Sequence, residues 1–178
     1  GVVVCDEFGR HAISLLGGHE GGANTLAHRV ASKTGCVSII TTGTESMKNY
    51  VLGVGCKKNA DYESLKGLVV EVLNNAKVLP DKVRVMTTID LKEKEPCILK
   101  LSDEFNWPLV IFSANEINAT KFQISHSKFV EDSIGVPGVC EPTALMASHF
   151  GELVVPKTTA NGCAVALAQE LKIMDRRP

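Results

Sequence analysis

The first forty residues combine short apolar runs with one helical stripe. Val2–Cys5 and His11–Leu16 are patterned as two short strands around a polar turn, which predicts a hairpin. From Ala23 onward apolar residues recur at helical spacing, and Gly35 marks the end of this helix. The β-branched run Val37–Thr41 predicts a strand that lies parallel to 11–16 across a βαβ crossover. This stretch is therefore predicted to be a partial βαβ, Rossmann-like region.

A second series of strands and helices follows a polar stretch at 46–49. The expected strands are 50–56, 83–88 and 108–112, and a terminal hairpin joins 153–156 to 163–168 around Asn161-Gly162. The expected helices are one that Asp61 caps and that runs through Leu73, one at 91–101 that Pro96 bends or interrupts, and one at 141–149. Between them, 117–138 is predicted to be a long loop with a short helix near 128–133. The pattern predicts an α/β fold with a mixed sheet flanked by helices.

The polar stretch also marks the expected domain boundary. The predicted organisation is a partial region at 1–46, a complete domain at 50–170 and a frayed, charged tail at 171–178. Gly1 leads straight into a strand without a preceding methionine, so we expect the chain to be part of a larger protein.

Composition narrows the class of function. The 178 residues carry 19 Lys and Arg against 20 Asp and Glu, a net charge of -1, and only 5% are aromatic. No basic field or aromatic platform for nucleic acid is evident. No apolar run reaches the ~20 residues that cross a bilayer, and no signal peptide pattern is present, so no membrane partner is expected. The six cysteines are dispersed, without a CxxC pair or a Cys/His cluster, which favours free thiols in the cytoplasm and no metal site.

The strongest candidate for chemistry is the glycine-rich turn from Ser14 to Asn24. Its glycines are Gly17, Gly18, Gly21 and Gly22. A strand-to-helix turn of this kind can present backbone N–H groups and a helix N-terminus to an anion, or it can need glycine for packing alone. His19 in the turn is a candidate general base, a ligand contact or an idle surface histidine. Asn24 could orient a carboxylate or a water, or cap the helix.

Further candidates follow the other predicted strands. Thr42 ends a strand at the same edge as the glycine turn, and Gly55 and Lys57 end the strand 50–56. The structural alternatives are close packing at the glycine and a solvated lysine. Asp90 and Ser113 could act on a substrate but are also typical helix caps, and Lys92 and Glu95 could pair with each other on one helix. A second glycine-rich turn, with Gly138, leads to Glu141 at a helix start, where a carboxylate serves either a site or the helix dipole.

Six segments taken in order resemble the cobalt-precorrin-5A hydrolase family of cobalamin biosynthesis. They are Ser14–Asn24, Thr41–Glu45, Gly53–Lys57, Thr88–Lys92 with Glu95, Phe112–Ala114 and Gly135–Glu141. The resemblance runs from about residue 3 to residue 168. It implies that 1–46 is the remnant of the family's N-terminal and central region, and that 50–170 is its C-terminal domain.

The resemblance also implies a reaction and its substrate. The family opens the δ-lactone of cobalt-precorrin-5A and releases a two-carbon unit as acetaldehyde, which gives cobalt-precorrin-5B. Cobalt comes with this cobalt-corrin substrate, so no cofactor is expected in the protein. His19, Asp90 and Glu141 are then the candidate catalytic residues. The candidate substrate-binding residues are Gly17, Gly18, Gly21, Gly22, Asn24, Thr42, Gly55, Lys57, Ser113 and Gly138. A homodimer or contacts with other cobalamin-pathway enzymes are the expected protein partnerships.

Two other functions compete with this one. The C-terminal part also resembles a shorter stand-alone protein of the aerobic cobalamin pathway, which favours a non-catalytic module that binds corrin intermediates. A nucleotide or phosphate binder is the weakest alternative. Gly17–Gly22 lacks the G-x-G-x-x-G spacing, and the chain has no P-loop lysine-serine pair.

Overall fold

The computed structural model describes residues 1–18, 21–40, 47–120, 122, 135–148 and 151–171. The chain divides into two compact units, Gly1–Lys48 and Asn49–Pro178. The first unit combines a sheet with one helix and the second a sheet with several, which confirms the α/β class predicted from the sequence.

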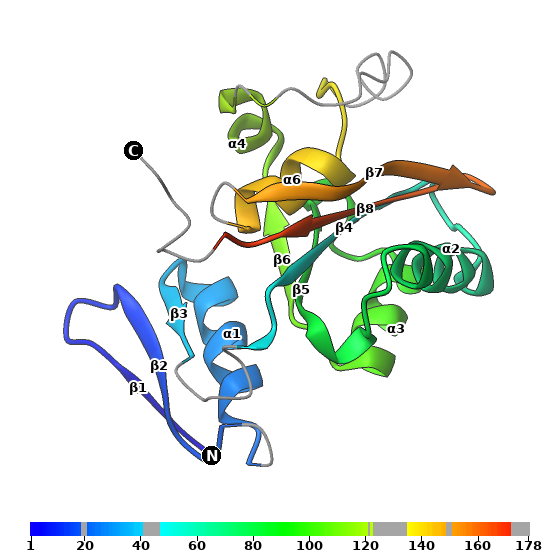
Figure 1. Cartoon of the computed structure of the whole chain (residues 1–178). Helices are drawn as coiled ribbons and strands as arrows, with labels where there is room; N and C mark the ends of the chain where they lie inside the picture. Colours follow the sequence, from blue (N-terminus) through cyan, green and yellow to red (C-terminus); the bar gives the residue numbers. More distant parts are fainter. Residues whose placement is uncertain (19–20, 41–46, 121, 123–134, 149–150, 172–178) are drawn as a thin grey trace. The chain divides into compact units, whose positions relative to one another are not determined.

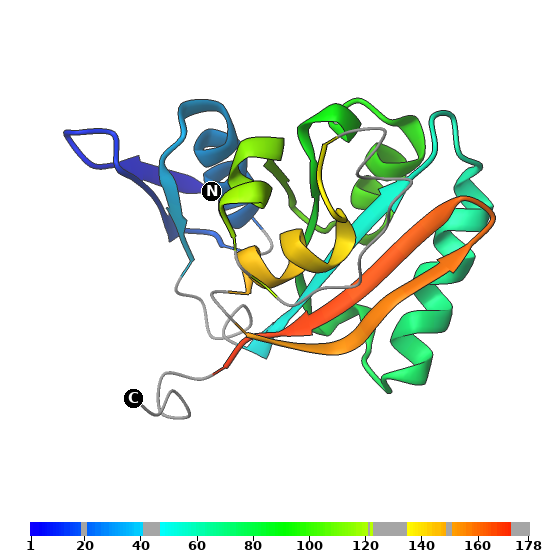
Figure 2. The same ribbon diagram turned by 90° about the horizontal axis from the view of Figure 1, so that it is seen from above.

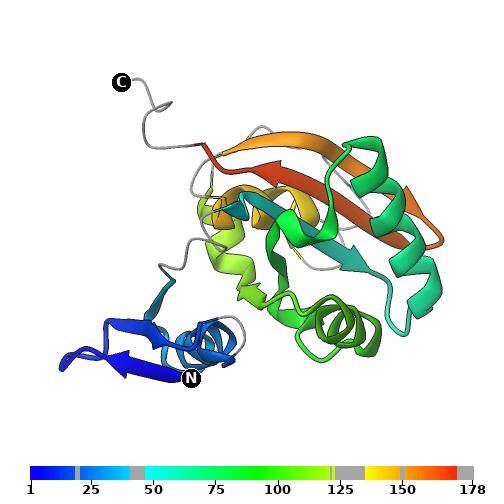
Figure 3. The ribbon, with the colours of Figure 1, turned by 60° about the horizontal axis from the view of Figure 1, so that its bottom comes forward.

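The first unit is a three-stranded sheet with one helix. It contains β1 (Val2–Cys5), β2 (His11–Leu16), α1 (Ala23–Thr34) and β3 (Val37–Ile39). The predicted antiparallel pairing of β1 with β2 and parallel pairing of β2 with β3 are both confirmed. Helix α1 packs on this sheet (Figure 3). It ends at Gly35, whose φ of 75° suits glycine.

The second unit is built on a five-stranded mixed sheet (Figures 1 and 2). Its strands are β4 (Tyr50–Cys56), β5 (Val83–Ile89), β6 (Leu109–Phe112), β7 (Glu152–Ala160) and β8 (Cys163–Gln169). The spatial order is β6-β5-β4-β8-β7. Strands β4, β5 and β6 are parallel to one another, while β8 runs antiparallel to both of its neighbours. The three parallel strands therefore end at one edge of the sheet.

Helices cover both faces of this sheet (Figure 1). Helices α2 (Tyr62–Asn75) and α3 (Pro96–Phe105) contribute to the larger core, which includes Leu52, Leu65, Met86, Ile98 and Leu101. On the opposite face, α6 (Cys140–Ala147) packs over a smaller cluster, and α4 (Ala114–Ala119) contributes to a third. No helix among the described residues is long and apolar enough to cross a membrane.

The predicted helix at 91–101 is wrong in its start. Asp90–Lys92 forms a separate 3₁₀ turn, and α3 begins at Pro96 rather than being interrupted there. Proline is well suited to a first helical position, because its fixed φ fits the helix and the first turn has no partner for an N–H. The proline therefore starts the helix.

The terminal hairpin is confirmed, but its first strand is longer than predicted. Strand β7 runs through Pro156 to Ala160. It is an edge strand, where a residue without an N–H is tolerated. Asn161 and Gly162 have φ values of 51° and 80°, as a two-residue type I′ turn requires. The strand predicted at 37–41 is shorter than expected, because β3 ends at Ile39. Thr41 and the predicted short helix near 128–133 lie outside the described residues.

Candidate functional site

The carboxyl edge of the second unit's sheet gathers several of the candidate residues. Strands β4, β5 and β6 end there at Cys56, Ile89 and Phe112. Lys57, Asp90 and Ser113 each follow one of these strands. In open α/β sheets this edge is where ligands bind. The edge is therefore the candidate site of this unit.

Helix α6 approaches β4 at its two glycines. A Cβ atom on Gly53 would overlap the carbonyl oxygen of Cys140 and lie 2.7 Å from its carbonyl carbon. A Cβ on Gly55 would lie 3.6 Å from the Cβ of Val139, an ordinary contact. The close packing that the sequence offered as an alternative at Gly55 is thus found at Gly53 instead. It brings the first turn of α6 onto the sheet.

Glu141 lies in that first turn and is only 2% exposed. Its Oε1 accepts the backbone N–H of Lys157 on β7 at 2.8 Å. A carboxylate here also meets the positive end of the helix dipole. The structure thus holds Glu141 in one orientation, as a positioned acid or base requires. Gly138, in the turn just before α6, is buried as well.

The neighbouring thiol is not a nucleophile at neutral pH. Burial, with the nearby Glu141 carboxylate as a second cause, raises the pKa of Cys140 to about 12. The reactive form of a cysteine is the thiolate. Cys140 therefore stays protonated and acts as an apolar residue of the helix.

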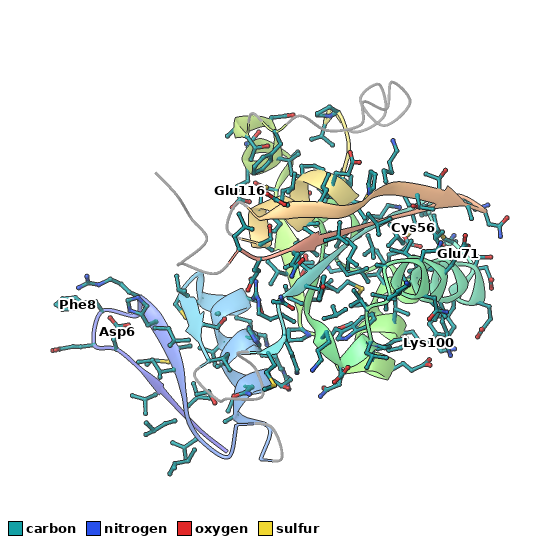
Figure 4. All side chains as sticks on the ribbon, viewed as in Figure 1. Asp6, Phe8, Cys56, Glu71, Lys100 and Glu116 are labelled. Atoms are coloured by element: carbon teal, nitrogen blue, oxygen red, sulfur yellow. The ribbon has the colours of Figure 1, made fainter. Side chains whose placement is uncertain are left out.

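Ser113 caps a helix, whereas Asp90 is the first residue of a 3₁₀ turn whose N-cap is Ile89. The Oδ1 of Asp90 accepts the N–H of Leu91 at 2.7 Å, and the aspartate is exposed. Ser113 forms a full capping box with Glu116, so its predicted alternative role as a helix cap is confirmed (Glu116 is labelled in Figure 4). Hydrogen bonds from the backbone N–H of Ser113 and then from its hydroxyl lower the pKa of Glu116. Both candidates are at the edge, and Ser113 already has a structural role as a helix cap.

The lysines at this edge differ in their contacts. The aliphatic stem of Lys57 lies against Gly162. A Cβ atom added to that glycine would be only 2.6 Å from the lysine Cδ. The Nζ of Lys92 pairs with Glu95 Oε2 at 3.4 Å, which confirms the predicted pair. The stem of Lys57 therefore packs against the turn between β7 and β8. The ammonium of Lys92 is held beside the start of α3.

A cluster of metal-ligand type at the same edge has no counterpart in the sequence prediction. Cys56, Glu95 and Cys97 place one ligand atom each within 4.8 Å of one another. The two sulfur atoms are 3.7 Å apart. Burial, with Cys97 as the next cause, raises the pKa of Cys56. Because 41 residues separate the two cysteines, no spacing motif could have indicated the cluster.

The glycine-rich turn of the first unit is closed by its own backbone. Gly17 and Gly22 have φ values of 67° and 72°. The N–H groups of Ala23 and Asn24 donate to the carbonyls of Gly17 and Gly18 at 3.1 and 2.9 Å. These two amides of the helix N-terminus are thus engaged, so an anion would have to use other groups of the turn.

Tight packing also explains part of the glycine content. A Cβ on Gly21 would lie 2.7 Å from the oxygen of Gly17. The side chain of Asn24 is buried and its Oδ1 accepts a hydrogen bond from Ser14 Oγ at 2.6 Å. The candidates His19 and Thr42 lie outside the described residues.

Solved structures with this fold belong to cobalamin biosynthesis. The chain is similar to CobE, a protein from the cobalamin (vitamin B12) biosynthetic pathway, with a TM-score of 0.65 and 21% identity over 69% of this chain and 91% of that chain. It is also similar to a cobalamin biosynthesis protein G homolog from Sulfolobus solfataricus, with a TM-score of 0.57 and 17% identity over 95% of this chain and 73% of the other. At these identities the likeness establishes the α/β fold alone.

Sequence comparison identifies the family. Residues 50–168 match the family described as Cobalamin synthesis G C-terminus, and residues 1–45 match Cobalamin synthesis G N-terminal. The chain therefore belongs to the cobalamin synthesis G family and to cobalamin biosynthesis, as the resemblance of its six segments predicted.

Curated relatives agree with this assignment. Cobalt-precorrin-5A hydrolase from Salmonella typhimurium is 22% identical and covers 93% of this chain, which spans 73% of that protein. A Methanocaldococcus jannaschii protein named "Probable cobalt-precorrin-5A hydrolase" is 31% identical over 67% of this chain, which spans 40% of that protein. Protein CobE from Sinorhizobium sp is 29% identical over 70% of this chain and 82% of its own length.

Proposed function

We propose that this chain carries out the cobalt-precorrin-5A hydrolase reaction. It would open the δ-lactone of the cobalt-corrin substrate and release a two-carbon unit as acetaldehyde to form cobalt-precorrin-5B. The observation that supports this most is that both parts of the family match in order, and that a relative named for this activity covers 93% of the chain.

The reaction needs water at a carbonyl together with a proton donor and acceptor. In the proposal Glu141 acts as an acid or base, since it is buried and oriented by the Lys157 N–H. Asp90 and His19 are the other proposed catalytic groups. Lys57 and the glycine-rich turns bind the carboxylates of the substrate. Cobalt is carried by the substrate, so the proposed reaction uses no cofactor of the protein.

Acetaldehyde release is the direct test of this activity. The purified chain is incubated anaerobically with cobalt-precorrin-5A, and acetaldehyde is assayed against a heat-denatured sample. We expect acetaldehyde and cobalt-precorrin-5B from the native chain. Tight binding of the substrate without acetaldehyde would refute catalysis by this chain and leave its family membership intact.

The second candidate is a module that binds corrin intermediates without converting them. The likeness to CobE supports it, because this chain spans 82% of the Sinorhizobium protein. Under either function the proposed location is the cytoplasm, where the free cysteines of the chain would stay reduced. A homodimer or other enzymes of the pathway are the proposed protein partners.

A further inference from the structure

The side chains of Cys56, Glu95 and Cys97 meet at the carboxyl edge of the second unit's sheet. Cys56 is the last residue of β4, and it packs against the core that α2 and α3 share with the sheet (Figure 4). Glu95 and Cys97 flank Pro96 at the start of α3. Glu95 and Cys97 are 8% and 3% exposed, and Cys56 is half-buried. A strand end and a proline-started helix thus hold three potential metal ligands on rigid elements.

We propose that these three residues bind a thiophilic divalent cation with tetrahedral preference, Zn²⁺ in the first instance. Thiolates and carboxylates are both zinc ligands, with Zn–S distances of about 2.3 Å. Two sulfurs on a tetrahedral zinc lie about 3.8 Å apart, and those of Cys56 and Cys97 are 3.7 Å apart. In a tetrahedral zinc site the carboxylate oxygen lies about 3.5 Å from each sulfur. Because all three ligand atoms already lie within 4.8 Å of one another, the oxygen has to approach each sulfur by about 1.3 Å or less.

Neighbouring groups fit a bound cation. The N–H of Asn59 donates to Glu95 Oε1 at 2.6 Å, which orients the carboxylate as outer partners of metal sites do. Two thiolates and one carboxylate on a divalent ion leave one negative charge. The ammonium of Lys92, 3.4 Å from Glu95 Oε2, neutralises it. Water would occupy the fourth coordination position of the ion, because the half-buried Cys56 leaves this side of the site open to solvent.

The ion would join the end of β4 to the start of α3. It would thereby hold the loop 57–59 and the turn 90–92, which lie beside these two ends. This role is structural: the ion takes no part in the proposed lactone reaction, although Lys57 and Asp90 lie in the segments that it would hold. The test below measures metal binding and not acetaldehyde, so failure of the site and failure of that activity are distinguishable.

Titration with Co²⁺ as a spectroscopic probe tests the site. The whole chain is reduced, freed of reductant under anaerobic conditions and titrated with the ion. We expect a thiolate-to-cobalt charge-transfer band that saturates at one equivalent and is displaced by Zn²⁺. Cys56→Ser and Cys97→Ser should lose the band, and Glu95→Gln should weaken binding by roughly tenfold or more. The control Cys140→Ser, a buried thiol on the opposite face of the sheet, should keep it.

A measurement on the unaltered chain guards against variants that do not fold. Zn²⁺ should raise the Tm in a concentration-dependent manner, since the ion binds the folded state. It should also protect two thiols from alkylation until the chain is denatured with a chelator. Two results of the Co²⁺ titration would overturn the proposal: no charge-transfer band in the reduced chain, or a band that persists in Cys97→Ser. The proposal also fails if the two thiols stay protected from alkylation after denaturation with chelator, because a disulfide would then explain the protection.

Discussion

Replacing Gly53 by alanine should destabilise the second unit far more than the same change at Gly55. Gly53 is not one of the described glycines with a positive φ, so its backbone conformation is compatible with alanine. The added methyl group would overlap the carbonyl oxygen of Cys140 and lie 3.1 Å from the Cβ of Ala144. Both neighbours belong to α6, so the helix must move as a body. Overpacking usually costs about 1–3 kcal/mol, and a backbone overlap belongs at or above the upper end.

Gly55→Ala is the matched control on the same strand and the same face. Its methyl group would meet Val139 at 3.6 and 3.7 Å, which is ordinary van der Waals contact. Removing a glycine from a strand is worth roughly 0.5–1 kcal/mol of stabilisation. The free energy of unfolding should therefore change by no more than about 1 kcal/mol. The two variants are expected to differ by about 3 kcal/mol or more.

Urea unfolding followed by tryptophan fluorescence measures this difference. Trp107 is the single tryptophan of the chain and is 4% exposed. Its Nε1–H donates to the carbonyl of Pro80 at 3.0 Å, so its emission reports on the second unit. With an m-value of about 2 kcal/mol/M, the midpoint of Gly53→Ala should fall by roughly 1.5 M. Equal urea midpoints for the two variants would refute the close contact between Gly53 and the Cys140 carbonyl of α6.

The remaining predictions concern the candidate site. Glu141→Gln keeps an acceptor for the Lys157 N–H, so acetaldehyde release should fall by ~10²-fold or more with little change in the free energy of unfolding. Glu141→Ala also loses that acceptor and should lower the free energy of unfolding by about 1–3 kcal/mol. Unchanged acetaldehyde release by Glu141→Gln would show that Glu141 is not a catalytic group. The pKa of Glu116 is lowered in the folded chain, so its contribution to stability is present above the pKa of an unfolded glutamate and lost as the pH falls through the lower folded value. Ser113→Ala should therefore lower the free energy of unfolding at pH 7 by about 1 kcal/mol, the value of a helix cap. The decline of this free energy toward pH 3 should also become less steep, because the hydroxyl that helps to lower the Glu116 pKa is lost while the backbone N–H remains; parallel pH profiles would contradict this. His19→Ala should lower turnover by ~10²-fold or more, and unchanged turnover with weaker substrate binding would make His19 a ligand contact.

Local signals in the sequence determined much of the fold. The turn at Asn161-Gly162 needs positive φ at both residues, and that residue pair is the one that accepts it. Asp61 caps α2 by accepting the N–H of Ser64 at 2.8 Å, as its position before an apolar stripe predicted. Where the prediction was wrong, Pro96 and Pro156 were the reason, since their effect depends on context. One begins a helix, and the other lies in a strand that has a free edge.

Less of the candidate site than of the fold could be predicted from the sequence. The position of Asp90 and Ser113 at strand ends follows from the strand pattern, because parallel strands end at one edge. The meeting of Cys56 with Cys97, and the burial of Glu141 against β7, depend on contacts between segments that are far apart along the chain. Only the packed fold reveals which of two glycines faces a helix backbone and which faces a side chain.

The central claim is that this member of the cobalamin synthesis G family converts its corrin substrate. The most direct measurement follows cobalt-precorrin-5A and acetaldehyde together in one anaerobic time course, with the chain in excess over the substrate. We expect one acetaldehyde for each cobalt-precorrin-5A consumed, with both changes at the same rate. A substrate that is bound by the chain and recovered unchanged, without acetaldehyde, would contradict it.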